Sequence, residues 1–246
     1  MNIYAAIALC FVPYIFVFFL FHFAVHVKIM TELWSSLLGL LAVVPITFIQ
    51  FYIAGIPFFN SGRWSSELLK AILFNGLIEE LLKMTVLFLI PSKKLTLGRF
   101  FACALLCGLS LGCFESVIYF LQHLQSANSR GAVLLYEQIF IRMFTTDILH
   151  MFCAGLAGLF VWSVKQHKTD VMAIIYPVII HGLYNFFALF DEYKWFALAA
   201  ILFAAVQCRI RYVNMKEDNP PVLHRRRISQ KKSVSDKKTQ KTVIKK

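Results

Sequence analysis

The sequence contains few charged residues for its length. Of its 246 residues only 15% are Asp, Glu, Lys or Arg, whereas 59% are hydrophobic. Soluble globular domains carry about 25% charged residues, so this scarcity excludes a soluble domain. It indicates an integral membrane protein, and the remaining polar sequence is too short to form a second folded domain.

Several other features are missing as well. The N-terminal residues MNIYAAIALC contain no basic residue, and no small-x-small cleavage site ends their apolar run. These absences favour a retained first span over a cleaved signal peptide. The six cysteines have neither zinc-finger spacing nor a paired extracellular placement, so we interpret them as small buried apolar residues. The chain also shows no internal repeat.

The apolar residues form continuous runs of span length instead of alternating with polar residues. About twenty apolar residues in a helix cross the hydrocarbon core of a bilayer, whereas a membrane β-barrel needs alternating polarity in strands of about ten residues. The predicted fold class is therefore all-α, a polytopic membrane helical bundle of about seven transmembrane helices within residues 1–213. The expected spans are Ile3–Val25, Leu33–Ile53, Leu68–Ile90, Phe100–Leu124, Gln138–Val164, Val171–Phe190 and Trp195–Val213.

Positive charge is concentrated at the C-terminal end. Residues 1–207 hold 12 Lys and Arg against 10 Asp and Glu, a net +2, whereas residues 208–246 hold 13 against 3, a net +10. We expect residues 214–246 to form a basic, disordered cytoplasmic tail that contacts anionic lipid headgroups and binds no nucleic acid. Seven spans then place the N-terminus outside, and the more basic connections lie inside.

Ionisable side chains occur inside several of the apolar runs. A charge at the centre of a membrane helix costs about 2.5–3.5 kcal/mol on insertion scales, so such residues usually face a bundle interior or a wet cavity and have a function there. Their helix positions place most of them near the bilayer midplane. The candidate catalytic residues are Glu79, Glu80, Glu115, His150 and His181.

Lys83 is the expected partner of one of the two adjacent glutamates. It follows Glu79 by four residues, which is the favourable spacing and order for an ion pair on one helical face. Glu80 lies about 100° further around the helix and is left without a local partner. Because burial and a neighbouring negative charge disfavour its ionised form, Glu80 is a candidate general base.

Two further residues are supporting candidates. Tyr119 lies one helical turn beyond the glutamate of the fourth expected span, and Asn185 lies one turn beyond His181, where an amide can fix the tautomer of the imidazole. Gly108 and Gly112, four residues apart, form a small-residue face for close approach of another helix.

Taken in order, these residues resemble the motifs of a known family, the PrsW-type intramembrane proteases, which are distant relatives of the type II CAAX prenyl endopeptidases. The resemblance covers residues 68–190 and departs from the family at Leu111, where the second motif usually has Phe. It rests on Glu79-Glu80-x-x-Lys83, the glycine-rich run into Phe114-Glu115-x-x-x-Tyr119, the His150 segment and His181-x-x-x-Asn185.

The resemblance implies an intramembrane endopeptidase of a bacterial cytoplasmic membrane that cleaves membrane-tethered proteins. In some members the substrate is an anti-sigma factor, cut on its extracytoplasmic side. By analogy, Glu79 and Glu80 are catalytic acids, one of which activates water, while His150 and His181 stabilise the oxyanion or protonate the leaving amine.

The resemblance also bears on the cofactor. No metal is expected, because relatives are often described as metal-independent glutamate proteases and the chain has no His-Glu-x-x-His helix. Zinc bound by two histidines and a glutamate is the alternative.

Two other classes of function also use buried ionisable residues. A proton- or ion-coupled transporter needs intramembrane relays of Glu and His, but the lack of an internal repeat argues against it. A catalytically inactive membrane scaffold would not require the intact glutamate pair and both histidines. The sequence therefore favours the peptidase.

The orientation can be tested with reporter fusions. A reporter joined after Val213 should report the cytoplasm, because residues from Cys208 onward carry +10 of the net +12 charge and basic segments stay inside. A reporter at the N-terminus should report the outside. An extracytoplasmic signal after Val213 would reverse the predicted topology.

Overall fold

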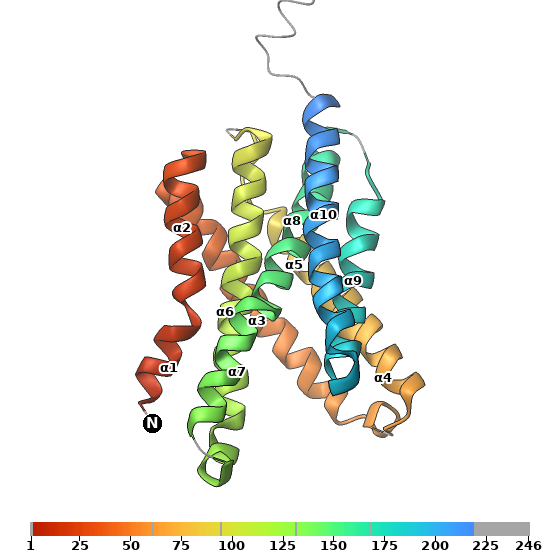
Figure 1. Ribbon diagram of the computed structural model, residues 1–246. Coiled ribbons are helices and arrows are strands. Elements are labelled where there is room, and N and C mark those ends of the chain that lie inside the picture. The colour runs from red at the N-terminus through yellow and green to blue at the C-terminus, as the bar shows by residue number, and fades with distance from the viewer. Residues whose placement is uncertain (1, 61, 94, 131, 168, 219–246) are drawn as a thin grey trace, which may run out of the picture. The chain divides into compact units, whose positions relative to one another are not determined.

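All regular structure in the described residues of the computed structural model is helical. The structure describes residues 2–60, 62–93, 95–130, 132–167 and 169–218. Most of the expected basic tail, residues 219–246, therefore lies outside the described residues. Residues up to Arg209 form one unit, the helical bundle, and the described residues from Ile210 to Asp218 belong to a second. Within the bundle, consecutive long helices run in opposite directions (Figure 1).

Among the residues that the structure describes, five helical segments are long and apolar enough to cross a membrane. This confirms the predicted multi-pass helical bundle. The first segment bends where its two helices meet, with Pro13 in the first turn of the second helix. The five segments are α1 (Ile3–Cys10) with α2 (Val12–Val25), α3 (Ile29–Ala54), α6 (Leu97–Arg130), α7 (Ala132–Phe144) with α8 (Thr146–Lys165), and α10 (Lys194–Asp218).

The other two expected spans consist of shorter helices. The sixth is α9 (Met172–Ala188), which has 17 residues and contains Pro177. The third is made of α4 (Trp64–Lys70), the π-helical segment η2 (Ala71–Ile78) and α5 (Glu79–Leu87). Two short 3₁₀ turns complete the elements, η1 (Pro57–Asn60) and η3 (Asp191–Tyr193).

The π-helical segment η2 lies directly before the paired glutamates of α5. Its turns are wider than α-helical turns, and such irregular turns are frequent at functional sites. Close packing holds it against α9: a side chain at Gly76 would overlap the carbonyl of Val178, and one at Gly182 would lie 2.8 Å from the Cα of Ile72. The two segments therefore meet backbone to backbone, which brings His181 of α9 up to the start of α5.

The expected span Gln138–Val164 is divided into α7 and α8 at Thr145. The backbone of Thr145 has φ −122° and ψ −81°, outside the usual helical region. Because the helix is interrupted there, α8 does not continue the last turn of α7. Arg142 in that turn reaches α6, while Thr146 begins the helix that carries the first site histidine.

α6 lies at the centre of the bundle and packs against both α3 and α8. Of its apolar window 78% is buried, against 17% for the α1–α2 segment. A side chain at Gly108 would overlap the carbonyl of His150, and one at Gly112 would lie 2.9 Å from the Cα of Asp147. The expected close approach at Gly108 and Gly112 is therefore present, and it places the backbone of α8 beside α6 at the site.

Contacts between helix ends place three connections at the same end of the bundle. Trp34, near the start of α3, donates to the carbonyl of Leu89 behind α5. Lys165, at the end of α8, donates to the carbonyls of Phe88 and Ile90 at 2.9 and 2.7 Å and so caps α5. The connections α2–α3, α5–α6 and α8–α9 therefore share one end, as the expected topology requires of the basic connections.

Candidate active site

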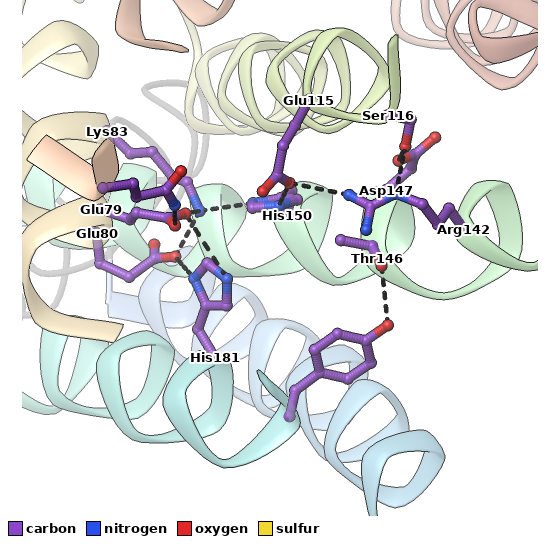
Figure 2. A network of polar contacts seen from close by, with 12 residues as sticks. Glu79, Glu80, Lys83, Glu115, Ser116, Arg142, Thr146, Asp147, His150 and His181 are labelled. Carbon is purple, nitrogen blue, oxygen red and sulfur yellow. Dashed lines mark hydrogen bonds and ion pairs between the residues drawn. The ribbon is translucent and has the colours of Figure 1, made fainter. Parts of the chain in front are cut away.

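The expected catalytic side chains meet between α5, α6, α8 and α9 (Figure 2). Exposed fractions are 2% for Glu79, 0% for Glu80 and 1% for both His150 and His181. Glu115 is the most accessible member, with 27% of its side chain exposed. Charges at such depth are tolerated only when they are paired and hydrogen-bonded, and every member of this group has a polar partner.

Lys83 lies in the middle of the group and is fully buried. Its Nζ donates to Glu80 Oε1 at 2.6 Å and lies 3.9 Å from Glu79 Oε2. The expected pair between Lys83 and Glu79 is therefore present, but the expectation that Glu80 is left without a local partner is wrong, because side chains three apart are also helix neighbours. Glu79 is engaged in addition by Gln50 of α3, whose Nε2 donates to Glu79 Oε1 at 2.6 Å.

His181 is oriented by the two glutamates of α5. Its Nδ1 lies 2.6 Å from Glu80 Oε1, and its Nε2 lies 3.7 Å from Glu79 Oε2. Among the described contacts, Asn185 makes no hydrogen bond to this ring. The close packing of η2 against α9 brings the Glu80 carboxylate to the ring of His181. This carboxylate is therefore the partner that can fix the tautomer of His181.

His150 connects the Lys83 side of the site to the Glu115 side. Its Nδ1 lies 2.8 Å from Lys83 Nζ, and its Nε2 lies 2.7 Å from Glu115 Oε2. Because an ammonium only donates, Nδ1 accepts from Lys83 and Nε2 donates to the carboxylate. The ring packs edge-on against His181, with centroids 4.8 Å apart.

A second polar network holds Glu115 from the side of α7. Arg142 Nη2 donates to Glu115 Oε2 at 3.3 Å, and Arg142 Nε donates to Ser116 Oγ at 3.1 Å. Ser116 in turn donates to Asp147 Oδ1 at 2.8 Å. The guanidinium lies 4.6 Å from the ring centroid of Tyr119, so Tyr119 supports Glu115 through the guanidinium.

Arg142 and Gln50 also belong to the site, although neither was among the residues predicted from the sequence. Arg142 carried the same signal as the chosen candidates, because it is an ionisable residue inside the fifth expected span. Gln50 carried a weaker signal, since an uncharged amide is less costly to bury than an ion. Only the approach of α3 to α5 shows that this amide reaches Glu79.

Three residues of the site are arranged as metal ligands. One ligand atom each from Glu79, His150 and His181 lies within 4.8 Å of the others. Glu79 Oε2 and Glu80 Oε2 are buried and have no hydrogen-bond partner among the described residues. Two imidazoles and a carboxylate suit zinc, and carboxylates behind the imidazoles commonly orient such ligands. The residues therefore fit a divalent metal, with Lys83 competing for one imidazole nitrogen.

Apolar helices that enclose carboxylates and imidazoles define a membrane protein with an intramembrane acid–base centre. A family model described as PrsW family intramembrane metalloprotease matches residues 28–208, which include every residue of the site. The chain belongs to this family and is thus an intramembrane protease. The match confirms the resemblance seen in the motifs and extends it to α3. No curated protein and no solved structure matches the chain.

Replacing Lys83 with Met should strongly destabilise the fold. Met roughly preserves the side-chain volume but removes the cation that faces Glu79 and Glu80. Removing one partner of a buried ion pair costs about 3–5 kcal/mol, so thermal unfolding in detergent should occur at a clearly lower temperature than in the wild type.

The control is Lys194→Met, which breaks an ion pair with Asp191 whose side chains are 64% and 91% exposed. Surface changes of this kind usually stay within about 0.5 kcal/mol. Equal unfolding temperatures for the two variants would show that the buried cation does not stabilise the bundle.

Proposed function

We propose that this protease cleaves membrane-tethered proteins and that Glu79, Glu80, Glu115, His150 and His181 are its catalytic set. One observation carries the proposal: each imidazole has one nitrogen on a carboxylate, while its other nitrogen faces Lys83 in His150 and Glu79 in His181. Such an arrangement presents two basic nitrogens in defined tautomers beside two carboxylates. A helix-packing role alone would not require this convergence.

Glu79, His150 and His181 are the residues that would hold the metal indicated by the family name. A divalent metal such as zinc supplies Lewis acidity toward a substrate carbonyl and makes water a nucleophile near neutral pH. Glu80 holds His181 through Nδ1, and Glu115 holds His150 through Nε2. These carboxylates keep both rings oriented for a ligand on the other nitrogen.

Glu80 is the proposed general base. Its Oε1 is occupied by Lys83 and His181, whereas its buried Oε2 has no partner among the described residues. Attack of water on the peptide carbonyl releases a proton, which this oxygen can accept. When the carbon–nitrogen bond breaks, the leaving amine takes up a proton, which the same carboxyl can return. Lys83 balances the negative charge of the carboxylate before it accepts the proton and after it returns it.

The position of Lys83 supports a second chemistry, in which no metal takes part. Its ammonium contacts Glu80 and His150, so it supplies a positive charge at the place where a metal would supply one. In that case Glu79 and Glu80 act as a glutamate-type pair, as the sequence predicts, and the histidines stabilise the oxyanion. Both chemistries give the same hydrolysis with the same residues.

The burial of the site supports a substrate that enters the bilayer. A peptide bond can reach side chains at this depth only if a membrane segment carries it. An anti-sigma factor tethered by a single span is the kind of substrate that some members of the family cleave. We propose a substrate of this class, in a cytoplasmic membrane, with the N-terminus outside and the C-terminus inside.

Replacing Glu80 or Glu79 with Gln should abolish proteolysis and leave the protein folded in the membrane. Gln keeps the shape of the side chain but cannot take a proton from water, and such a loss typically lowers the rate about 10²–10⁴-fold. The measurement is cleavage of single-span polypeptides by purified protein. Glu137→Gln, at an exposed position of α7, is the matched control. Wild-type rates in both site variants would remove the pair from catalysis.

Metal content separates the two chemistries. We expect stoichiometric metal in the purified protein, loss of metal and activity after exhaustive chelation, and recovery of both when zinc is restored. His150→Ala and His181→Ala should lower the metal content, whereas His167→Ala, at an exposed position, should not. Full activity in demonstrably metal-free protein would instead establish the glutamate chemistry.

A further inference from the structure

An apolar groove lies between α3 and α6, beside the site. Its cavity volume is about 330 Å³. Phe48 and Phe51 at its rim are 73% and 82% exposed, and both belong to a membrane-spanning helix, so the groove opens toward lipid. The residues that line it include Val43, Thr47, Phe48, Phe51, Phe114 and Ile118.

The groove adjoins the site through residues that are neighbours in the chain. On α3, Phe51 follows Gln50, whose amide donates to Glu79. On α6, Phe114 precedes Glu115, whose carboxylate contacts the imidazole of α8. Thr47 of the lining lies three residues before Gln50, and Ile118 lies three residues after Glu115, so each is a helix neighbour of a side chain in the site.

Exposure indicates that access to the site is from the side of Glu115. Glu115 has 27% of its side chain exposed, whereas those of Glu79 and His181 are 3% and 1% exposed. The groove wall formed by Phe114 and Ile118 flanks Glu115 along the same helix. A substrate segment that approaches Glu115 from the lipid would pass over the groove.

We propose that this groove is the specificity pocket of the protease. It takes one or two large apolar side chains of the substrate's transmembrane segment, next to the bond that is cleaved. The inference rests on the proposed function and adds to it the kind of residue that the substrate presents.

The size and the lining of the groove define the occupant. Its volume of about 330 Å³ is at the low end of the range of about 300–1,000 Å³ for ligand pockets. It therefore fits a few side chains and not a whole helix, which is about 10–12 Å across. Thr47 is the one polar residue among its lining residues, so a charged side chain would lose its hydration without gaining partners.

Photocrosslinking tests occupancy without requiring cleavage. The probe is a tagged single-span polypeptide with a leucine-rich span, expressed together with the Glu80→Gln variant. A photoreactive benzoylphenylalanine in place of Thr47 should crosslink to the probe. The same group in place of Leu37 should not, although Leu37 is also 44% exposed on α3 and lies about 15 Å along the helix. Equal yields at the two positions, or crosslinks only to lipid or to a second copy of the chain, would overturn the proposal.

Size selectivity tests the groove in the active protein. Single-span polypeptides that carry Ala, Leu, Phe or Asp beside the cleaved bond form the panel. The wild type should prefer Leu and Phe, and Thr47→Trp, which fills the groove, should shift the ratio of Phe to Ala cleavage at least about tenfold toward Ala. Leu37→Trp should keep the wild-type ratio.

The outcomes distinguish this proposal from the proposed function. If Thr47→Trp cleaves the panel with an unchanged ratio of Phe to Ala cleavage, the groove is not the specificity pocket. The proposed function is unaffected by that result. Crosslinking at position 47, together with no cleavage of any panel member by the wild type, supports the docking groove and contradicts the proposed substrates.

Discussion

The buried ammonium of Lys83 is the contact on which the rest of the site depends. Carboxylates packed this closely in an apolar bundle repel one another and lose their hydration, and both effects oppose folding. Lys83 donates to Glu80, lies near Glu79 and donates to His150, so one cation links α5 to α8. The imidazole of α9 joins the same group through Glu80. The residues that balance the charges of the site are therefore the same residues that connect its helices.

Irregular helix geometry brings these groups together. The π-helical segment Ala71–Ile78 precedes the glutamates, and Gly76 and Gly182 let its backbone meet that of α9. The break at Thr145 separates the helix that carries Arg142 from the one that carries His150. Continuous α-helices with larger residues at these positions could not hold the donors at hydrogen-bond distance, because the backbones would stand further apart.

Family membership and geometry together account for an intramembrane protease. The proposed catalytic groups are almost fully buried, and their most accessible member, Glu115, lies beside a groove that opens to lipid. The proposed function therefore favours substrates that arrive within the membrane over soluble peptides. The same centre combines possible metal ligands with an internal ammonium, which is why the metal-dependent and glutamate chemistries share their residues.

The sequence by itself determined the all-α membrane class, the approximate spans and the side chains that meet. Apolar runs of span length are local signals, and ionisable residues such as Glu115 or His150 inside them have few stable environments other than a shared interior. The four motifs also identified the family that the match to residues 28–208 shows. The close approach at Gly108 and Gly112 could be predicted because small residues four apart lie on one helical face.

Only the tertiary structure decided how these residues pair. Lys83 engages Glu80 more closely than Glu79 because Gln50, from a distant segment, takes a Glu79 oxygen. Arg142 joins Glu115 because α7 ends at Thr145 beside α6. Spacing along one helix limits which partners are within reach, but the choice among them depends on hydrogen bonds from other helices, and those follow from packing of the whole bundle.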